Sequence, residues 1–429
     1  MSQLPFQAPW SFSKRLAFRF FFLFFVLYIF FNPNGVFPGI DALYGVYITP
    51  FHSLIPWIGK HVLHLSYDIN TFTNGSGDTT YDFVVLLFTL LTAFAGSLIW
   101  TALDRNRKSY NQLYYWLTVV VRYYAAFTML TYGFVKIFKL QFPAPSLNRL
   151  LQPYGESSPM GLAWTFMGYS EGYNLFTGAA EALGGILLLF RRTALLGAIV
   201  TLIVMANVMA MNYSFDIPVK LLSTMMVVMA CFLLAKDMHR LINVFFLNKT
   251  AEPGHTRAPR SSRKWVRITL LVCKILLVGY TLVMTVYGSY SALSRYGDKA
   301  AKPVLYGIYD VDVFVKNGDT LPPLKTDSVR WSRMVVNYDG YAGVKLINDS
   351  ATGYAFEPDT AKKQIVLYSY NDTLHKALFA YSNPEKNILL LQGKWKDDSF
   401  HIRMKQYDLK RFLLVNRGFR WINEYPYNR

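Results

Sequence analysis

The sequence contains only two cysteines, and their scarcity excludes two classes of site. Cys231 and Cys273 both lie inside apolar segments, and no CxxC pair is present. A disulfide framework needs several spaced cysteines, and a dithiol redox centre needs a paired motif. We therefore expect neither in this chain.

Charged residues are also scarce. They make up 16% of the 429 residues, against about a quarter in a typical soluble domain, whereas 53% are hydrophobic. The net charge is nevertheless +18. Cytoplasmic loops of membrane proteins collect Lys and Arg, and no nucleic-acid-binding motif accompanies the basic excess. We therefore expect the lipid bilayer, including anionic lipid, as the partner and no nucleic acid.

The motifs of common soluble enzymes are absent too. No HExxH, nucleophile elbow or dinucleotide-binding loop occurs, and the Gly-rich residues 74–82 lack the GK[ST] ending of a P-loop. Asp78 or Thr79 in that segment is better explained as a helix cap. His61 and His64 would share a face of a helix, which is a weak metal signal. Ordinary interfacial histidines are the preferred interpretation, so we expect no metal.

Long apolar segments are what the sequence has in abundance. A spanning helix needs about 20 mostly apolar residues. Seven segments qualify, at residues 15–32, 83–103, 115–138, 173–190, 193–212, 218–236 and 267–290. An apolar part of the loop between the first two contains Pro50 and Pro56. These prolines favour interrupted interfacial or re-entrant helices over a further span.

Lys and Arg gather on one side of these seven segments. They precede the first and follow the second, fourth and sixth, and the opposite loops hold few. The positive-inside rule then places the N-terminus in the cytoplasm and the C-terminus outside. The prediction is a multi-pass protein of the inner (plasma) membrane.

Beyond residue 295 the hydrophobic period changes from helical to two. Asn317-Gly318 is a strong hairpin signal. Eight runs alternate, at residues 310–316, 331–338, 341–347, 364–370, 376–381, 386–392, 399–405 and 411–415. We expect an extracytoplasmic antiparallel β domain, either a sandwich or a barrel. The aromatic and basic residues 417–429 either close its core or form a contact surface.

These patterns predict five regions. They are N-terminal spans one and two (1–114), a four-helix membrane core (115–249), a basic cytoplasmic linker (250–266), the seventh span (267–292) and the β domain (293–429).

Charged residues inside spans are costly and need a partner or a purpose. Arg122 and Glu181 have similar expected depths, so we expect them to pair. The pair is either a structural lock between spans three and four or a proton or ligand site. The other candidate ligand-binding residues are Lys136, Asn207, Asp216, Lys220, Glu156 and Glu171. Most of these would converge at the outer face, although Asp216 is equally well explained as a helix cap.

Residues 115–236 resemble the DoxX-like family of four-helix membrane proteins. The resemblance rests on Arg122, on Gly133 and Lys136 in a Gly-x-x-Lys pattern, and on Glu181, which opens a Glu-x-x-Gly-Gly motif. Phe190 is a departure, because many members have Gly there. The resemblance implies a four-helix unit and, from some relatives, association with quinone-dependent or other membrane redox chemistry. The lack of paired cysteines argues against a thiol role.

Two functions remain open at this stage. The chain is either a redox-associated membrane subunit, with a quinone between spans three and six lined by Arg122, Lys136 and Glu181, or a non-catalytic module. The second reading is an envelope scaffold, assembly factor or transporter-like protein whose β domain binds an envelope protein partner. Whether the chain is an enzyme stays undecided.

Overall fold

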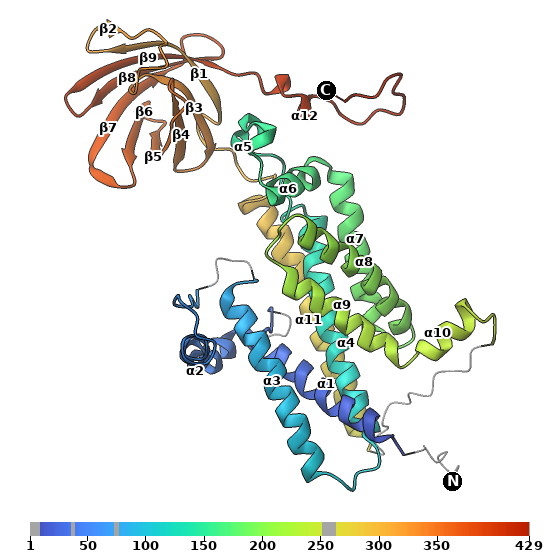
Figure 1. Ribbon diagram of the computed structural model, residues 1–429. Helices are drawn as coiled ribbons and strands as arrows, with labels where there is room; N and C mark the ends of the chain where they lie inside the picture. The colour runs from blue at the N-terminus through green and yellow to red at the C-terminus, as the bar shows by residue number, and fades with distance from the viewer. Residues whose placement is uncertain (1–8, 36–38, 73–76, 251–262, 429) are drawn as a thin grey trace. The chain divides into compact units, whose positions relative to one another are not determined.

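The computed structural model of this chain describes residues 9–35, 39–72, 77–250 and 263–428. Two compact units make up the fold (Figure 1). The helical unit comprises Met1–Gln141 and Glu171–Leu293, and the barrel unit comprises Phe142–Ser170 and Ser294–Arg429. The segment between α4 and α7 therefore belongs with the barrel, a grouping that the sequence patterns did not indicate.

Each of the seven apolar segments forms a helix. They are α1 (Phe12–Phe31), α3 (Thr80–Leu103), α4 (Asn111–Ile137), α7 (Glu171–Leu189), α8 (Ala194–Ser214), α9 (Lys220–Ala235) and α11 (Lys264–Arg295). By length and composition, α3, α8 and α11 are each able to cross a bilayer. The pair of α9 and α10 (Met238–Phe245), bent by 79°, adds a fourth if it counts as one span. The expected number of seven spans stays a prediction.

The helix α2 (Ile40–His61) runs through Pro50 and Pro56 without a break, contrary to the expectation that these prolines interrupt it. A proline inside a helix costs about 3 kcal/mol, so packing must offset it. One face of α2 supplies that packing, because the buried Ile48 and Ile55 join a cluster with residues of α3. In Figure 1, α2 is seen along its axis and α3 from the side, so the two helices cross.

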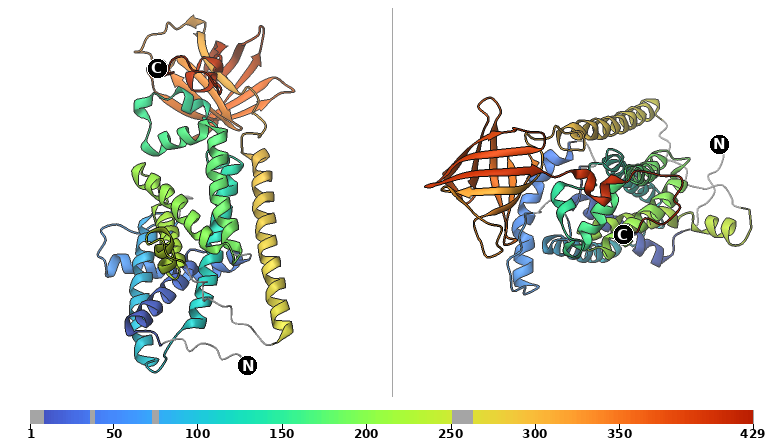
Figure 2. Two further views of the ribbon diagram at one scale, coloured as in Figure 1. Left: turned by 90° about the vertical axis from the view of Figure 1, so that its right-hand side faces the viewer. Right: turned by 90° about the horizontal axis from the view of Figure 1, so that it is seen from above.

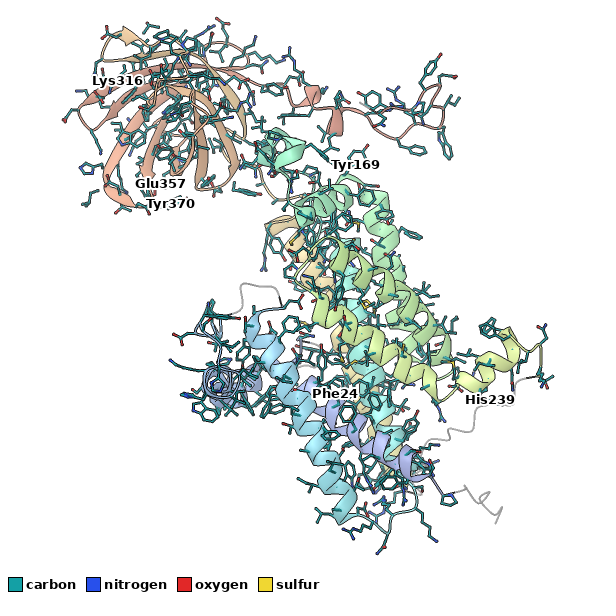
Figure 3. All side chains as sticks on the ribbon, viewed as in Figure 1. Phe24, Tyr169, His239, Lys316, Glu357 and Tyr370 are labelled. Carbon is teal, nitrogen blue, oxygen red and sulfur yellow. The ribbon has the colours of Figure 1, made fainter. Side chains whose placement is uncertain are left out.

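Aromatic side chains fill much of the core of the helical unit. Buried residues of α1, α3, α4, α7, α8 and α9 form one cluster. Within it, Phe25 of α1 packs at 4.9 Å between ring centroids against Phe232 of α9. Phe24, labelled in Figure 3, stacks on Phe20 at 5.9 Å. Such pairs add about 0.5–1.5 kcal/mol beyond burial, so the Phe25–Phe232 pair helps to hold α1 on the bundle, whereas the Phe20–Phe24 pair lies within α1.

The C-terminal strands close into an eight-stranded antiparallel barrel (Figure 2). The strands are β1 (Gly307–Lys316), β3 (Trp331–Tyr338), β4 (Tyr341–Leu346), β5 (Ala351–Asp359), β6 (Gln364–Ser369), β7 (Asp372–Ser382), β8 (Ile388–Trp395) and β9 (Asp398–Gln406), and the short β2 (Asp319–Thr320) extends β1. Neighbours in sequence pair, and β1 also pairs with β9. This closure leaves no open edge, which decides between the sandwich and the barrel.

One predicted strand is wrong. Residues 411–415 fall in a 3₁₀ turn (Leu409–Arg411) and the short helix α12 (Leu413–Asn416). The barrel closes at β9, so no partner strand is left for them. The Asn317-Gly318 hairpin is confirmed, because both residues have the positive φ that a tight β-hairpin turn needs, 54° and 90°.

The barrel unit also contains α5 (Leu147–Leu151), a 3₁₀ turn (Tyr154–Glu156) and α6 (Pro159–Tyr169). Leu147 is buried against Ile308 and Val335. Its backbone N–H donates to Asn337 Oδ1 at 3.0 Å. These contacts anchor the segment on the outside of β1 and β3.

Candidate functional site

The helices α4 and α7 approach each other closely through glycines. A Cβ atom on Gly133 would lie 2.7 Å from the backbone N of Ala182, and one on Gly178 would lie 2.7 Å from Gly133 O. A Cβ on Gly185 would lie 2.8 Å from Ala126 O. Because no larger residue fits these positions, the small residues of this segment serve packing.

Lys136 and Glu181 form a buried ion pair at this interface. The Lys136 ammonium donates to Glu181 Oε1, and the two side chains are 5% and 2% exposed. The second oxygen, Glu181 Oε2, is buried without a hydrogen-bond partner. Neither residue lines any of the three cavities described below. The pair therefore has the features of a lock between the helices that the glycines bring together.

The predicted Arg122–Glu181 pair is wrong. Arg122 lies roughly 21 Å further along α4 than Lys136, at about 1.5 Å per residue. The prediction assumed that the inner ends of α4 and α7 lie at one level. Gly178 instead faces Ile137. Continuing this antiparallel alignment brings Arg191, at the end of α7, to the level of Arg122, and both line a small cavity.

The expected outer cluster does not form around Lys136. Asp216 and Lys220 pair with each other at 2.9 Å between Oδ1 and Nζ, and this bond lowers the pKa of the exposed Asp216. Glu171 is exposed at the start of α7, and Glu156 is exposed in the barrel unit. Asn207 is also exposed, on α8. These residues were chosen for their types, and only tertiary contacts show that they face outward.

Asp78, not Asp216, caps the start of α9. The Asp78 carboxylate accepts the N–H groups of Lys220 at 2.5 Å and Leu221 at 2.8 Å. Asp216 instead has a φ of 51° in the preceding turn. Thr79 caps α3 in a reciprocal box with Asp82, which confirms the capping interpretation of that residue.

The two histidines do not form a metal site. Helix α2 ends at His61, and His64 has a φ of 52°, so they do not share a helical face. His61 packs against Trp57. Within the described ranges, no group of three or more His, Cys, Asp or Glu residues is placed to hold a metal ion.

A cavity of about 440 Å³ lies between α1, α3, α4 and α9. Its wall combines phenol, amide and carboxylate groups with apolar side chains, including Tyr28, Tyr44, Tyr132, Asn32, Asn34, Asp78, Asp82, Leu86, Leu222 and Met225. A second cavity of about 250 Å³ shares Phe31, Asn32, Tyr44 and Asp82 with it. The two cavities therefore adjoin each other.

Most polar groups around this cavity already have partners. Tyr124, behind the wall, accepts from Asn34 Nδ2 and donates to Asn32 O, each at 2.7 Å. The carboxylates of Asp78 and Asp82 accept capping N–H groups. Burial raises the pKa of Tyr44, whose hydroxyl donates to Phe31 O at 3.3 Å.

The Tyr132 hydroxyl has no hydrogen bond to any residue in the described ranges. It is therefore a neutral donor on an otherwise satisfied wall. A flat, mostly apolar ligand with one acceptor oxygen suits such a surface.

Arg19 is a buried cation that the sequence reasoning missed. Its guanidinium donates to Tyr110 Oη at 2.9 Å, to Thr101 Oγ1 at 2.8 Å and to Asp104 O at 2.8 Å. The signal was present, since an Arg inside a Phe-rich apolar run needs partners. With its donors satisfied in this way, Arg19 ties α1 to the end of α3.

The sequence matches no family model and no solved structure. It is similar to a protein of Bacillus subtilis (strain 168) called "Uncharacterized protein YwoB". The two are 37% identical over 133 residues, which cover 29% of this chain and 79% of YwoB. That name assigns no activity, and the likeness to DoxX-like proteins stays a prediction. Through the shared segment, this chain belongs to the same family as YwoB.

Proposed function

We propose that this chain is a multi-pass inner-membrane protein whose helical unit binds a quinone, as a subunit associated with membrane redox chemistry. The observation that carries the proposal is the cavity of about 440 Å³ beside Tyr132. The site differs from the one expected from the sequence, because Arg122, Lys136 and Glu181 do not line it.

The wall of the cavity suits a quinone in three respects. Tyr28 and Tyr132 offer aromatic faces for a flat ring, and Leu222 and Met225 are apolar contacts. The unpaired Tyr132 hydroxyl is a donor for a quinone carbonyl oxygen. Such a hydrogen bond between neutral groups contributes about 1 kcal/mol.

The test is to identify and count the bound ligand. The full-length protein is purified in mild detergent, and organic extracts are analysed by mass spectrometry for quinones. Leu86→Trp should fill the cavity and remove most of the ligand, whereas Leu87→Trp is the control, because Leu87 is exposed and outside the cavity.

Tyr132→Phe should lower quinone occupancy about tenfold at limiting quinone, through the loss of one hydrogen bond of about 1–1.5 kcal/mol. Tyr213→Phe is the control on the exposed face of α8. Absence of quinone from the parent protein, even after addition of excess quinone, would refute the proposal.

The exposed tail favours a second candidate function, a scaffold whose β domain binds an envelope protein. Phe419, Trp421 and Tyr425 are 80%, 90% and 83% exposed, so the tail does not close the barrel core. Its backbone is held at Arg417, whose carbonyl accepts from Tyr169 Oη at 3.1 Å, and Tyr169 is labelled in Figure 3. Aromatic and Arg side chains are enriched at contact surfaces.

Truncation after Asn416 tests this candidate. Hydrogen exchange in β1–β9 should be unchanged, because the barrel core contains no tail residue. Site-specific crosslinking from position 421 in intact cells should capture one defined envelope protein. Loss of protection across the barrel would show instead that the tail is part of its fold.

A further inference from the structure

Three cationic side chains from three different elements line one small cavity of the helical unit. Arg122 lies in α4, Arg191 in the turn between α7 and α8, and Lys236 at the C-cap of α9. The cavity volume is about 50 Å³. One water molecule needs roughly 10–15 Å³ by this measure, so the cavity admits a group of about three to five heavy atoms. The remaining wall consists of Tyr115, Thr118, Val119, Ala194, Leu195 and Leu233.

The positive charge in this cavity is not balanced by the chain. Arg122 and Arg191 form no ion pair with any acidic residue in the described ranges, and Arg122 Nε is buried without a hydrogen-bond partner. The carboxylate beside Lys236 is Asp237, at 3.8 Å, and it also pairs with Arg240 at 2.7 Å. Arg122, Arg191 and Arg240 all repel the Lys236 ammonium. One carboxylate therefore faces four cations.

Such a cluster needs an anion. The cations that line this cavity repel one another, and an anion bound between them relieves that repulsion. Guanidinium groups bind phosphate oxygens in pairs, and an ammonium adds a point charge. A tetrahedral phosphate also matches the size of the cavity. These features select a phosphate group.

We propose that this pocket, lined by Arg122, Arg191 and Lys236, binds the phosphate of an anionic phospholipid. The lipid, rather than free phosphate, follows from the surroundings, because Trp116 and Leu196 beside the lining residues are apolar and exposed. Acyl chains can lie against them. The choice of a lipid rests on the proposed membrane location, whereas the pocket itself is independent of the quinone cavity.

The experiment uses the full-length protein in detergent and native mass spectrometry. Phosphatidylglycerol should be retained, and phosphatidylcholine should be retained at least about tenfold less. Arg191→Gln should weaken phosphatidylglycerol retention about tenfold, as expected for loss of charge-assisted hydrogen bonds. Arg192→Gln is the matched control, because Arg192 is the neighbour in the same turn and does not line the pocket.

Arg122→Gln should have the same effect as Arg191→Gln, and Arg122→Lys should keep part of the binding, because it retains the charge and loses the paired donors. Arg191 is exposed in a turn, so we expect its replacement to leave the helices intact. Arg191→Gln therefore tests the pocket even where Arg122→Gln disturbs the packing of α4.

Equal losses in Arg191→Gln and Arg192→Gln would overturn the proposal, since they indicate general attraction to a basic surface. Inorganic phosphate that raises the melting temperature as much as phosphatidylglycerol does would overturn the choice of a lipid. Quinone content should be unchanged in these variants.

Discussion

Removal of one member of the Lys136–Glu181 pair should destabilise the helical unit more than removal of both. Glu181→Leu leaves the Lys136 ammonium without its carboxylate, at a side-chain exposure of 5%. Lys136→Met leaves a carboxylate whose second oxygen already lacks a partner. Breaking a buried pair in this way costs about 3–5 kcal/mol, whereas replacing both members by apolar residues of similar volume is often neutral.

The double variant Lys136→Met with Glu181→Leu should therefore lie within about 1.5 kcal/mol of the parent protein. The two single losses should exceed the double loss by at least about 3 kcal/mol. We set the expected difference this low because the group left without its partner can become neutral by changing its protonation state, which reduces the cost of each single replacement.

The assay is hydrogen exchange with mass spectrometry on α4 and α7 in the full-length protein, with a denaturant series to convert protection into free energy of opening. A local readout is needed because the chain has two compact units and does not unfold as one.

Additive single losses, or single variants as stable as the parent, would refute the reasoning that the pair is a lock. A stable Glu181→Gln variant that has lost its quinone would assign the pair to ligand binding instead.

Three further outcomes follow from the packing and the caps. Gly133→Ala should destabilise the α4–α7 contact by about 1–3 kcal/mol, because its Cβ would meet backbone at 2.7 Å, whereas Gly172→Ala, with nothing within 4 Å, should be neutral in the same exchange assay. Asp78→Ala should lower the free energy of opening at the start of α9 by about 1 kcal/mol, which speeds hydrogen exchange there, and Asp216→Ala should not. Backbone N–H groups of Arg330 and Val329 lower the pKa of Asp327, so its contribution to the barrel is present above about pH 4 and is lost as the pH falls through the lowered pKa; an acid melt whose barrel midpoint is the same in Asp327→Asn and the parent would contradict this.

The sequence patterns were most informative where periodicity decides the element. All seven apolar segments are helices, and seven of the eight predicted strands exist, because burial of one face imposes a period of 3.6 or 2 on the chain. The strand β5 was missed, since Gly353 and Pro358 break its pattern. Residues 411–415 alternate without having a partner strand, which shows that alternation alone does not make a strand.

The candidate site was harder to predict, because it depends on how helices align. The residue types Lys136 and Glu181 were recognised, but their pairing required the offset between α4 and α7 that the glycines allow. The same offset places Arg122 at the level of Arg191, and both line one cavity. Tyr132 gave no signal, since a tyrosine in an apolar helix is common and only the cavity distinguishes it.

The sequence by itself determined the helical class of the first part, the β class of the last part and the costly charges between apolar residues. Local periodicity and the energetic penalty for charge in an apolar segment both depend only on residues that are close together in the sequence. Only the tertiary structure decided which charge meets which, that Asp78 caps a helix far from it in sequence, and that the β domain closes as a barrel. Those outcomes depend on contacts between distant segments, and no local pattern specifies the register at which such segments meet.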